Sequence, residues 1–391
     1  MSEPSGYAEA LERAGFETIT DRSAGEDRLA TGGRLDLAVL DLDGEKAAVT
    51  ATYELLHQGR TVPTLLLFNE DIPEGLNPSC PPDELAIKPL PAEALVYRLQ
   101  ALLIREGRHL NEGGAWTDLN QGEAGTIGEG RVVSVFAPKG GVGKTTIAVN
   151  VAVALREQTR ERVLLLDADV GVGNVTAVID APQTMGLIGL ADSAAEEWTE
   201  VAFEQSVAVH QPSGLRILTW GNEPGDSERI SVELLLAAVR WGKAHHAYVV
   251  IDNHPGYSDR TMAMLTVSHQ TLLVVTPEVG AVRNSSQFLD LARQLGLADT
   301  VRVVANRANH GIRIDDMAQS LGLPISATVV SSGPKAVIAA NEGTPIITKF
   351  PRERISTDLH NVARLVTREE VVAVPERAKR RWFSFVRVSN A

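Results

Sequence analysis

One stretch of this chain constrains its fold more than any other, and it reads VVSVFAPKGGVGKTTI from Val132 to Ile147. The stretch opens with an apolar run over 132–137, which predicts a buried parallel strand. Three glycines follow, and Lys144-Thr145-Thr146 then leads into an apolar, alanine-rich helix pattern over 147–155. A strand, a glycine loop, Lys-Thr and a helix in this order form a phosphate-binding loop. The alternative is a simple glycine turn before a buried helix, and the flanking strand and helix argue against it.

Each residue type in this loop suits the binding of a phosphate chain. Glycines let successive backbone N–H groups point at one anion, and the following helix directs its positive end to the same place. Lys144 adds a full positive charge for the β- and γ-phosphates, and the Thr145 hydroxyl is placed to bind Mg²⁺. The residues predicted to bind ATP here are Gly140, Gly141, Val142, Gly143, Lys144, Thr145 and Thr146.

A second lysine, Lys139, gives the loop the form KGGVGKTT. This form resembles the deviant phosphate loop of the MinD/ParA family of ATPases. The resemblance implies that Lys139 reaches across a dimer interface to the partner's nucleotide, so that ATP holds two subunits together. Lys139 and Lys144 would then both serve catalysis. Taken alone, Lys139 could also be a solvated loop lysine.

Acidic residues stand at the ends of two further apolar strand patterns. One pattern ends in Asp167-Ala168-Asp169, and the other ends in Asp252. Ligands bind at the carboxyl ends of parallel strands, which favours an active-site role over a structural one. By the family resemblance, Asp169 positions the attacking water, while Asp167 and Asp252 hold Mg²⁺ together with Thr145.

Further segments extend the resemblance over about residues 131–366. The glycine-containing segment 170–174 resembles the family's switch loop. The apolar strand over 301–305 ends at Asn306, to which the resemblance assigns contact with the adenine edge; an Asn that caps the next turn is the alternative. His254 departs from the family pattern, in which this position carries proline or a small residue. We interpret it as a loop histidine, with a functional role as the alternative.

Residues 1–106 alternate helix and strand patterns in an order that resembles a response-regulator receiver domain. Asp41 ends an apolar strand pattern at the place of that family's phosphoacceptor, and Lys88-Pro89 matches its Lys-Pro pair. The opening strand with paired acidic residues is not found, although phosphotransfer needs the metal that such a pair holds. We therefore expect a pseudo-receiver used for docking or dimerisation, with a working phosphoacceptor at Asp41 as the alternative.

The predicted fold class is α/β, with two domains, as the length of 391 residues favours. A truncated receiver-like, flavodoxin-like domain (1–106) is followed by a linker (107–130), which is rich in Gly, Glu, Asn and Thr. A ParA/MinD-like P-loop NTPase domain with a mostly parallel sheet (131–370) comes next, and a basic, aromatic tail (371–391) ends the chain.

The net charge of −13 is distributed unevenly. Residues 1–126 hold 10 basic residues against 22 acidic ones, whereas residues 376–391 hold 5 against 1. The acidic body argues against DNA as a partner, because DNA binding depends on neutralising phosphates. The tail places Trp382, Phe383 and Phe385 among its cations. Peripheral membrane contact through 376–388 is one interpretation of this composition, and a packed strand or a disordered basic tail are the others.

Several features favour the cytoplasm as the compartment of this protein. No apolar run is long enough to span a bilayer, and the first residues lack the basic and apolar parts of a signal peptide. The single cysteine, Cys80, excludes an internal disulfide, which agrees with a reducing environment.

A receiver-like domain before a deviant phosphate-loop ATPase resembles the CpaE/TadZ proteins of the ParA/MinD superfamily. The resemblance implies a slow ATPase that uses Mg²⁺, forms an ATP-dependent homodimer, and works with pilus assembly or polar localisation proteins. Its role would be to position Tad/Flp-type pilus machinery at a cell pole, without contact to DNA. Three alternatives stay open. They are positioning of another cargo (division, flagella or DNA), a phosphorylated regulator with an ATPase output, and a non-hydrolysing ATP-dependent scaffold.

Overall fold

The computed structural model describes residues 4–19, 35–42, 46–57, 62–69, 84–105, 108–110, 116–118, 130–171, 173, 175–221 and 224–367. Cys80, Asn174 and the tail segment 376–388 lie outside the described residues, as does most of the expected linker 107–130. None of the helices within the described ranges combines the length and the apolar character that a membrane crossing requires.

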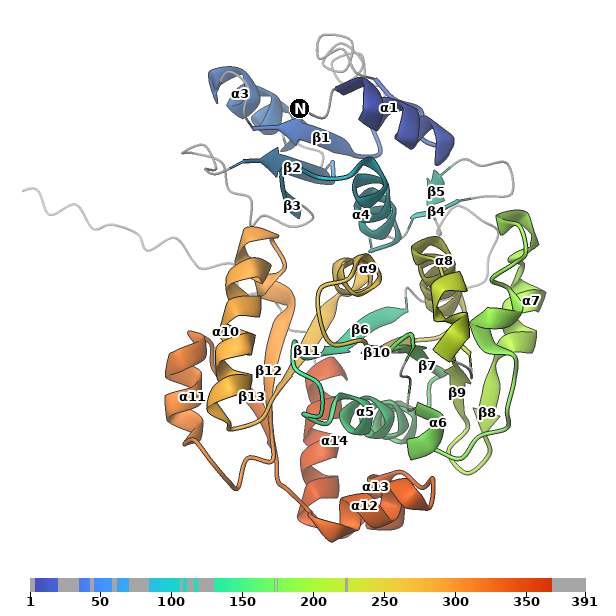
Figure 1. The fold of residues 1–391 in the computed structure, drawn as a ribbon, viewed down its shortest axis with the longest axis vertical. Helices are drawn as coiled ribbons and strands as arrows, with labels where there is room; N and C mark the ends of the chain where they lie inside the picture. Colours follow the sequence, from blue (N-terminus) through green and yellow to red (C-terminus); the bar gives the residue numbers. More distant parts are fainter. Residues whose placement is uncertain are drawn as a thin grey trace, which may run out of the picture.

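A large, mostly parallel sheet forms the centre of the C-terminal part of the chain (Figure 1). In spatial order its eight strands are β13 (Ile325–Val329), β12 (Val301–Asn306), β11 (Gln270–Val275), β6 (Arg131–Phe136), β10 (Tyr248–Asn253), β7 (Val163–Ala168), β9 (Leu215–Leu218) and β8 (Ala208–His210). The edge strand β8 pairs antiparallel with β9, and all other neighbours pair parallel. The prediction of an α/β domain with a mostly parallel sheet is confirmed.

Helices cover both faces of this sheet because its strands are apolar on both faces. In β7, Val163 and Leu165 belong to one hydrophobic core, and Leu164 and Leu166 belong to the core on the other face. Such a continuous apolar run is typical of a strand buried on both sides. The helices that pack side by side are α5 (Lys144–Thr159) with α14 (Arg354–Thr367), and α8 (Val232–His245) with α9 (Asp259–Val267).

Further helices surround these layers (Figure 1). They are α6 (Val175–Val178), α7 (Glu200–Ser206), α10 (Val279–Gln294), α11 (Ile314–Leu321), α12 (Pro334–Asn341) and α13 (Ile346–Lys349). α10 and α11 pack together beside β11 and β12, and α12 and α13 lie next to α14 (Figure 1). These elements leave the carboxyl ends of the central strands for the loops that follow them.

The N-terminal part is a smaller parallel sheet with its own helices. Its elements are α1 (Pro4–Arg13), β1 (Ala38–Asp41), α3 (Lys46–His57), β2 (Thr64–Phe68), β3 (Glu84–Ile87) and α4 (Ala92–Arg105). The strands pair in the order β1-β2-β3. An antiparallel pair, β4 (Arg108–Leu110) and β5 (Trp116–Asp118), lies within the expected linker. The receiver-like character of this part stays a prediction.

Helix α4 packs against both parts of the molecule. Leu95 and Leu99 belong to the core of the N-terminal sheet, whereas Ala101 and Ile104 join the core beneath α8 and α9. Lys243 of α8 is 1% exposed, and its ammonium donates a hydrogen bond to the Ile104 carbonyl oxygen at 2.9 Å. The two parts are therefore connected by a shared helix as well as by the segment that follows it (Figure 1).

Candidate nucleotide-binding site

Residues 137–143 connect β6 to α5 and form the glycine loop. Gly141 and Gly143 have φ angles of +77° and +96°, in the left-handed region that favours glycine. A Cβ atom at Gly143 would lie 2.5 Å from Nδ2 of Asn306, so that neighbouring side chain also requires glycine here. Gly143 precedes the first turn of α5 and offers no side-chain cap. The first N–H groups of α5 are therefore available to an anion in the loop.

Lys144 and Thr145 begin α5 and meet the end of β10. Lys144 is 6% exposed, so its ammonium is withdrawn from bulk water. Both residues lie close enough to Asp252 to lower the pKa of its carboxyl group. The structure thus brings the loop cation and the loop hydroxyl to the acidic residue that the sequence analysis assigned to Mg²⁺.

The register of the sheet gathers the acidic residues at one place. Strands β7 and β10 are neighbours, with Asp167 opposite Asp252. Asp169 follows β7 directly, and its N–H donates to Oδ1 of Asp167 at 3.1 Å. Burial, and then the nearby charge of Asp252, raise the pKa of Asp167 well above its usual range. Such repulsion between carboxyl groups is relieved when a cation lies between them.

Asp252 shows whether these residues fit a metal ion. Burial raises the pKa of Asp252 to about 7, against the opposing influence of Thr145 and Lys144. Its side chain is fully buried, and in the described part of the chain neither carboxyl oxygen has a hydrogen-bond partner of normal geometry. Buried oxygens without a partner are costly, and a hydrated divalent cation would satisfy both. Asp252, Asp167 and Thr145 therefore fit a site for hydrated Mg²⁺.

Asn306, at the end of β12, supports the phosphate loop. Its Nδ2 donates to the Val142 carbonyl at 2.8 Å, and its Oδ1 accepts from the Arg307 N–H at 2.9 Å. Arg307 has a φ of +57° and donates from Nη2 to the Gly141 carbonyl at 3.2 Å. The sequence analysis did not foresee this supporting role, and the contact of Asn306 with the adenine edge stays a prediction.

Lys139 lies on the surface beside the loop. Its ammonium is 3.0 Å from Oε2 of Glu278, and 42% of its side chain is exposed. This pair lowers the pKa of Glu278. An exposed ion pair contributes little to stability, so Lys139 can leave Glu278 at small cost. Its reach across a dimer interface stays a prediction.

His254 contacts the site, and this contact favours the functional role that the sequence analysis kept as the alternative to a loop histidine. It follows β10 directly, and its Nδ1 lies 2.6 Å from Oδ1 of Asp169. One sequence signal could have indicated this contact. Asp167-x-Asp169 and Asp252-x-His254 share one spacing, and each follows an apolar strand pattern; the two strands are neighbours in the sheet.

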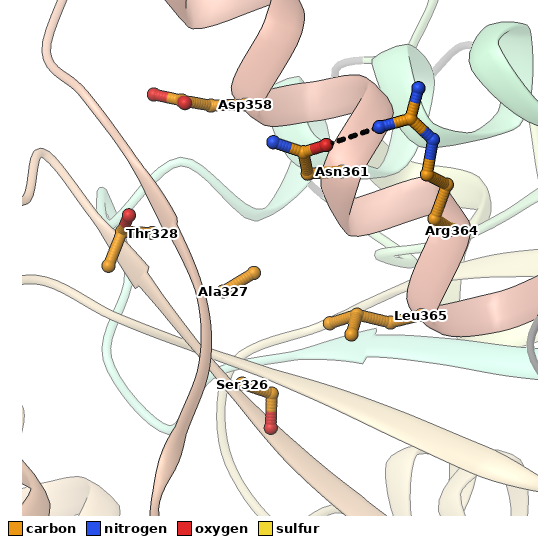
Figure 2. Close-up of a pocket in the computed structure, with 7 residues that line it drawn as sticks. All are labelled: Ser326, Ala327, Thr328, Asp358, Asn361, Arg364 and Leu365. Carbon is orange, nitrogen blue, oxygen red and sulfur yellow. Dashed lines mark hydrogen bonds between the residues drawn. The ribbon is translucent and has the colours of Figure 1, made fainter. Parts of the chain in front are cut away.

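A separate hollow of about 300 Å³ lies between β13 and α14 (Figure 2). Its lining consists of Ser326, Ala327, Thr328, Asp358, Asn361, Arg364 and Leu365. Figure 2 shows Arg364 directed at Asn361, whose Oδ1 accepts a hydrogen bond at 2.6 Å. None of these residues belongs to the phosphate loop or to the acidic strand ends, so this hollow is distinct from the candidate site.

The parallel sheet covered by helices, the glycine loop and the buried acidic strand ends define a nucleotide-binding protein of the P-loop class. Residues 129–367 match the ParA family model, which is described as NUBPL iron-transfer P-loop NTPase. The match spans more than half of the chain, and the protein therefore belongs to the ParA/MinD family of P-loop NTPases. Members of this family are generally ATPases.

Individual relatives agree with this assignment. The septum site-determining protein MinD of Thermotoga maritima is 28% identical over 252 residues, which cover 62% of this chain and 90% of that protein. A ParA family ATPase from Chlorobium tepidum has a similar fold, with a TM-score of 0.55 at 19% identity over 60% of this chain and 97% of that one. MinD from Pyrococcus horikoshii, complexed with Mg-ADP, also has a similar fold. Its TM-score is 0.52 at 22% identity, and the match covers 60% of this chain and 95% of that one. The predicted family and P-loop fold are confirmed for the C-terminal part.

Proposed function

We propose that this protein is an ATP-hydrolysing dimerisation switch that positions Tad/Flp-type pilus assembly machinery in the cell. The position of Lys139 carries the first half of this proposal. Lys144 is buried beneath the loop, where it serves the nucleotide of its own subunit, whereas the side chain of Lys139 is 42% exposed. A lysine that stands on the surface beside the loop can reach a nucleotide held by a second copy.

Different residues of the site bind the phosphates, hold the metal ion and orient the attacking water. Loop N–H groups and Lys144 bind the phosphates of ATP. Asp252, Asp167 and Thr145 would hold Mg²⁺, which would offset the charge of the phosphates. Asp169 orients a water molecule in line with the γ-phosphate. The water oxygen bonds to the γ-phosphorus as the bond to the β–γ bridging oxygen breaks, which yields ADP and phosphate. The loss of the γ-phosphate then lowers the affinity between subunits.

The N-terminal part supports the pilus assignment. Lys88, which follows β3, and Asp41, the last residue of β1, meet at 2.8 Å, in keeping with the lysine and phosphoacceptor positions of a receiver-like unit. Such a unit before a ParA/MinD-family ATPase is the arrangement of the CpaE/TadZ proteins. The proposed partners are pilus assembly or polar localisation proteins, and the proposed location is the cytoplasmic face of a cell pole, with peripheral membrane contact through 376–388.

Positioning of another cargo is the second candidate, because the MinD relative is a septum site-determining protein. Iron transfer, which the description of the family model mentions, is less compatible with this chain. Iron–sulfur clusters are held by several cysteine thiolates, and the 391 residues contain one cysteine. Cells that carry only Lys144→Ala should lose surface pili and still divide normally. Misplaced septa with intact pili would instead favour the division cargo.

Molar mass from light scattering, measured with ADP and with a non-hydrolysable ATP analogue, tests the switch. We expect the wild type to dimerise with the analogue only, and Lys139→Ala to stay monomeric with both nucleotides. Lys335→Ala is a matched control, because Lys335 is also 42% exposed and also paired with a glutamate, Glu353, but lies outside the loop. Dimers of wild type and Lys139→Ala in every nucleotide state would contradict the switch and indicate a constitutive scaffold.

A further inference from the structure

His254 joins the two loops that follow β7 and β10. These strands are parallel neighbours in which Asp167 lies opposite Asp252. Asp169 lies two residues after Asp167, and His254 lies two residues after Asp252. Side chains two residues apart on a strand point to the same face, so Asp169 and His254 are expected to lie opposite each other as well. Nδ1 of His254 and Oδ1 of Asp169 are 2.6 Å apart. The contact therefore follows from the register of the two strands.

The chemistry of the pair assigns His254 as the donor. An imidazole N–H donates and a carboxylate oxygen accepts, so we assign Nδ1 of His254 as the donor, and the separation of 2.6 Å is that of a short hydrogen bond. Among the described residues, the second oxygen of Asp169, Oδ2, has no hydrogen-bond partner. The Asp169 side chain is 8% exposed and that of His254 is 38% exposed. One carboxylate oxygen is thus anchored from the solvent side, and the other is left for a water molecule.

Asp169 needs such an anchor because it lies among like charges. It is within electrostatic reach of both Asp167 and Asp252. The hydrogen bond to His254 holds the Asp169 side chain in place beside these two carboxyl groups. Lys144 acts on Asp252, and His254 is the donor found at Asp169 itself.

We propose that His254 is a positioning residue for ATP hydrolysis, which holds the Asp169 carboxylate in the orientation that places the attacking water and ties the two loops together. This inference rests on the proposed function, in which Asp169 orients that water. No hydrogen bond joins His254 to residues 138–145 within the described ranges. His254 therefore acts on turnover and leaves nucleotide affinity unchanged.

This role can be tested with substitutions of His254 that place a hydrogen-bond donor at different positions. The amide nitrogen of asparagine stands where Nδ1 stands, whereas that of glutamine stands near Nε2. We expect kcat to fall about 10- to 100-fold in His254→Ala and His254→Gln, the loss of one charge-assisted hydrogen bond. His254→Asn should stay within about threefold of wild type, and the Kd for ATP should change less than about twofold in all three. Equal activity of the asparagine and glutamine variants would overturn the proposal.

The Asp169→Ala background shows whether His254 acts through Asp169. In that background, which should bind ATP and turn it over slowly, His254→Ala should lower kcat no further. An equal fold-change in both backgrounds would show that the two residues act independently, and would overturn the positioning role.

Hydrogen–deuterium exchange of the nucleotide-free protein provides a readout that is independent of turnover. Peptides that cover 163–171 and 253–260 should exchange faster in His254→Ala and His254→Gln than in wild type and His254→Asn. Unchanged exchange in all variants would overturn the tie between the loops. A wild type that binds ATP without hydrolysing it would instead contradict the proposed ATPase function, and the exchange data would still decide whether His254 holds Asp169.

Discussion

Asn306 shows how a single side chain can shape the phosphate loop. Its amide donates to the carbonyl of Val142 and accepts from the N–H of Arg307. It is 9% exposed, and glycine at position 143 leaves the space that its Nδ2 occupies. A loop that must direct its N–H groups at phosphates has carbonyl groups that face away, and Asn306 satisfies one of these.

We predict that Asn306→Ala weakens ADP binding about tenfold, because the buried carbonyl of Val142 loses its donor and the loop loses a support. If Asn306 acts by holding the loop, the Kd values for ADP and GDP should rise by the same factor, since the phosphates are common to both. Isothermal titration of the two nucleotides provides the measurement. A selective loss of ADP binding would instead support contact with the adenine edge.

At the scale of elements, the residue that caps the C-terminal end of α8 is a histidine that burial keeps neutral. His246 is 2% exposed, and its Nδ1 donates to the Gly242 carbonyl at 3.0 Å. Its Nε2 is buried and has no hydrogen-bond partner among the described residues. Burial lowers the pKa of His246 to about 4, against a usual value of 6.5. A proton at Nε2 would thus be a buried charge without an acceptor.

This histidine predicts a loss of stability in mild acid. Below pH 6.5 the unfolded chain binds a proton at His246, whereas the folded protein binds it only near pH 4. The contribution to stability is therefore complete above pH 6.5 and is lost as the pH falls toward 4. Between pH 7.5 and 5.0 the free energy of unfolding should fall about 2 kcal/mol more in wild type than in His246→Asn. Urea titrations at the two pH values measure this difference, and equal losses would contradict the assignment.

The elements that could be predicted from sequence are those with strong local patterns. The strand over 132–137 is apolar on both faces, and the loop residues 140–146 carry their chemistry in consecutive positions. The region 181–213 could not be interpreted, because its parts are short: β8 has three residues and α7 has seven. Three residues are too few to show a period.

Two features of the site depend on contacts between distant residues. His254 meets Asp169 because β7 and β10 are neighbours in a given register. Asn306 meets Val142 although 164 positions separate them. The sequence places each residue at a strand end, but the order of strands in the sheet decides which ends meet. The sequence also contained a signal for the packing of α4 against both parts. Residues 101–104 are all apolar, and a helix that is apolar on all sides is buried on all sides. The sequence analysis did not use this signal.

At the scale of the whole molecule, α4 makes the two parts depend on each other. Ala101 and Ile104 are 0–1% exposed within the core that α8 and α9 share with the large sheet. Thr266 of α9 also donates to Oε1 of Glu84 in β3, at 3.3 Å. Because α9 follows the loop that contains His254, the N-terminal part packs on the first helix after the nucleotide site.

We predict that the protein unfolds in one cooperative transition in scanning calorimetry, because removal of either part would expose the apolar contacts of α4. Lys243→Met should lower Tm and keep a single transition, since it removes the buried hydrogen bond to Ile104, worth about 1–3 kcal/mol. Lys335→Met removes only an ion pair of a half-exposed side chain and should change Tm much less. Two separate transitions in wild type would contradict the shared core.

Because α4 packs against both parts, it also limits the positions at which recombination can join this chain to another one. A chimaera joined after residue 105 would bring a foreign helix against α8 and α9, with other side chains in place of Ala101 and Ile104. A crossover that respects the packing must fall before α4, within the N-terminal sheet, so that α4 is inherited with the ATPase. The segment that must be exchanged as a unit therefore begins before α4, inside the N-terminal part, and not at the linker between the two parts.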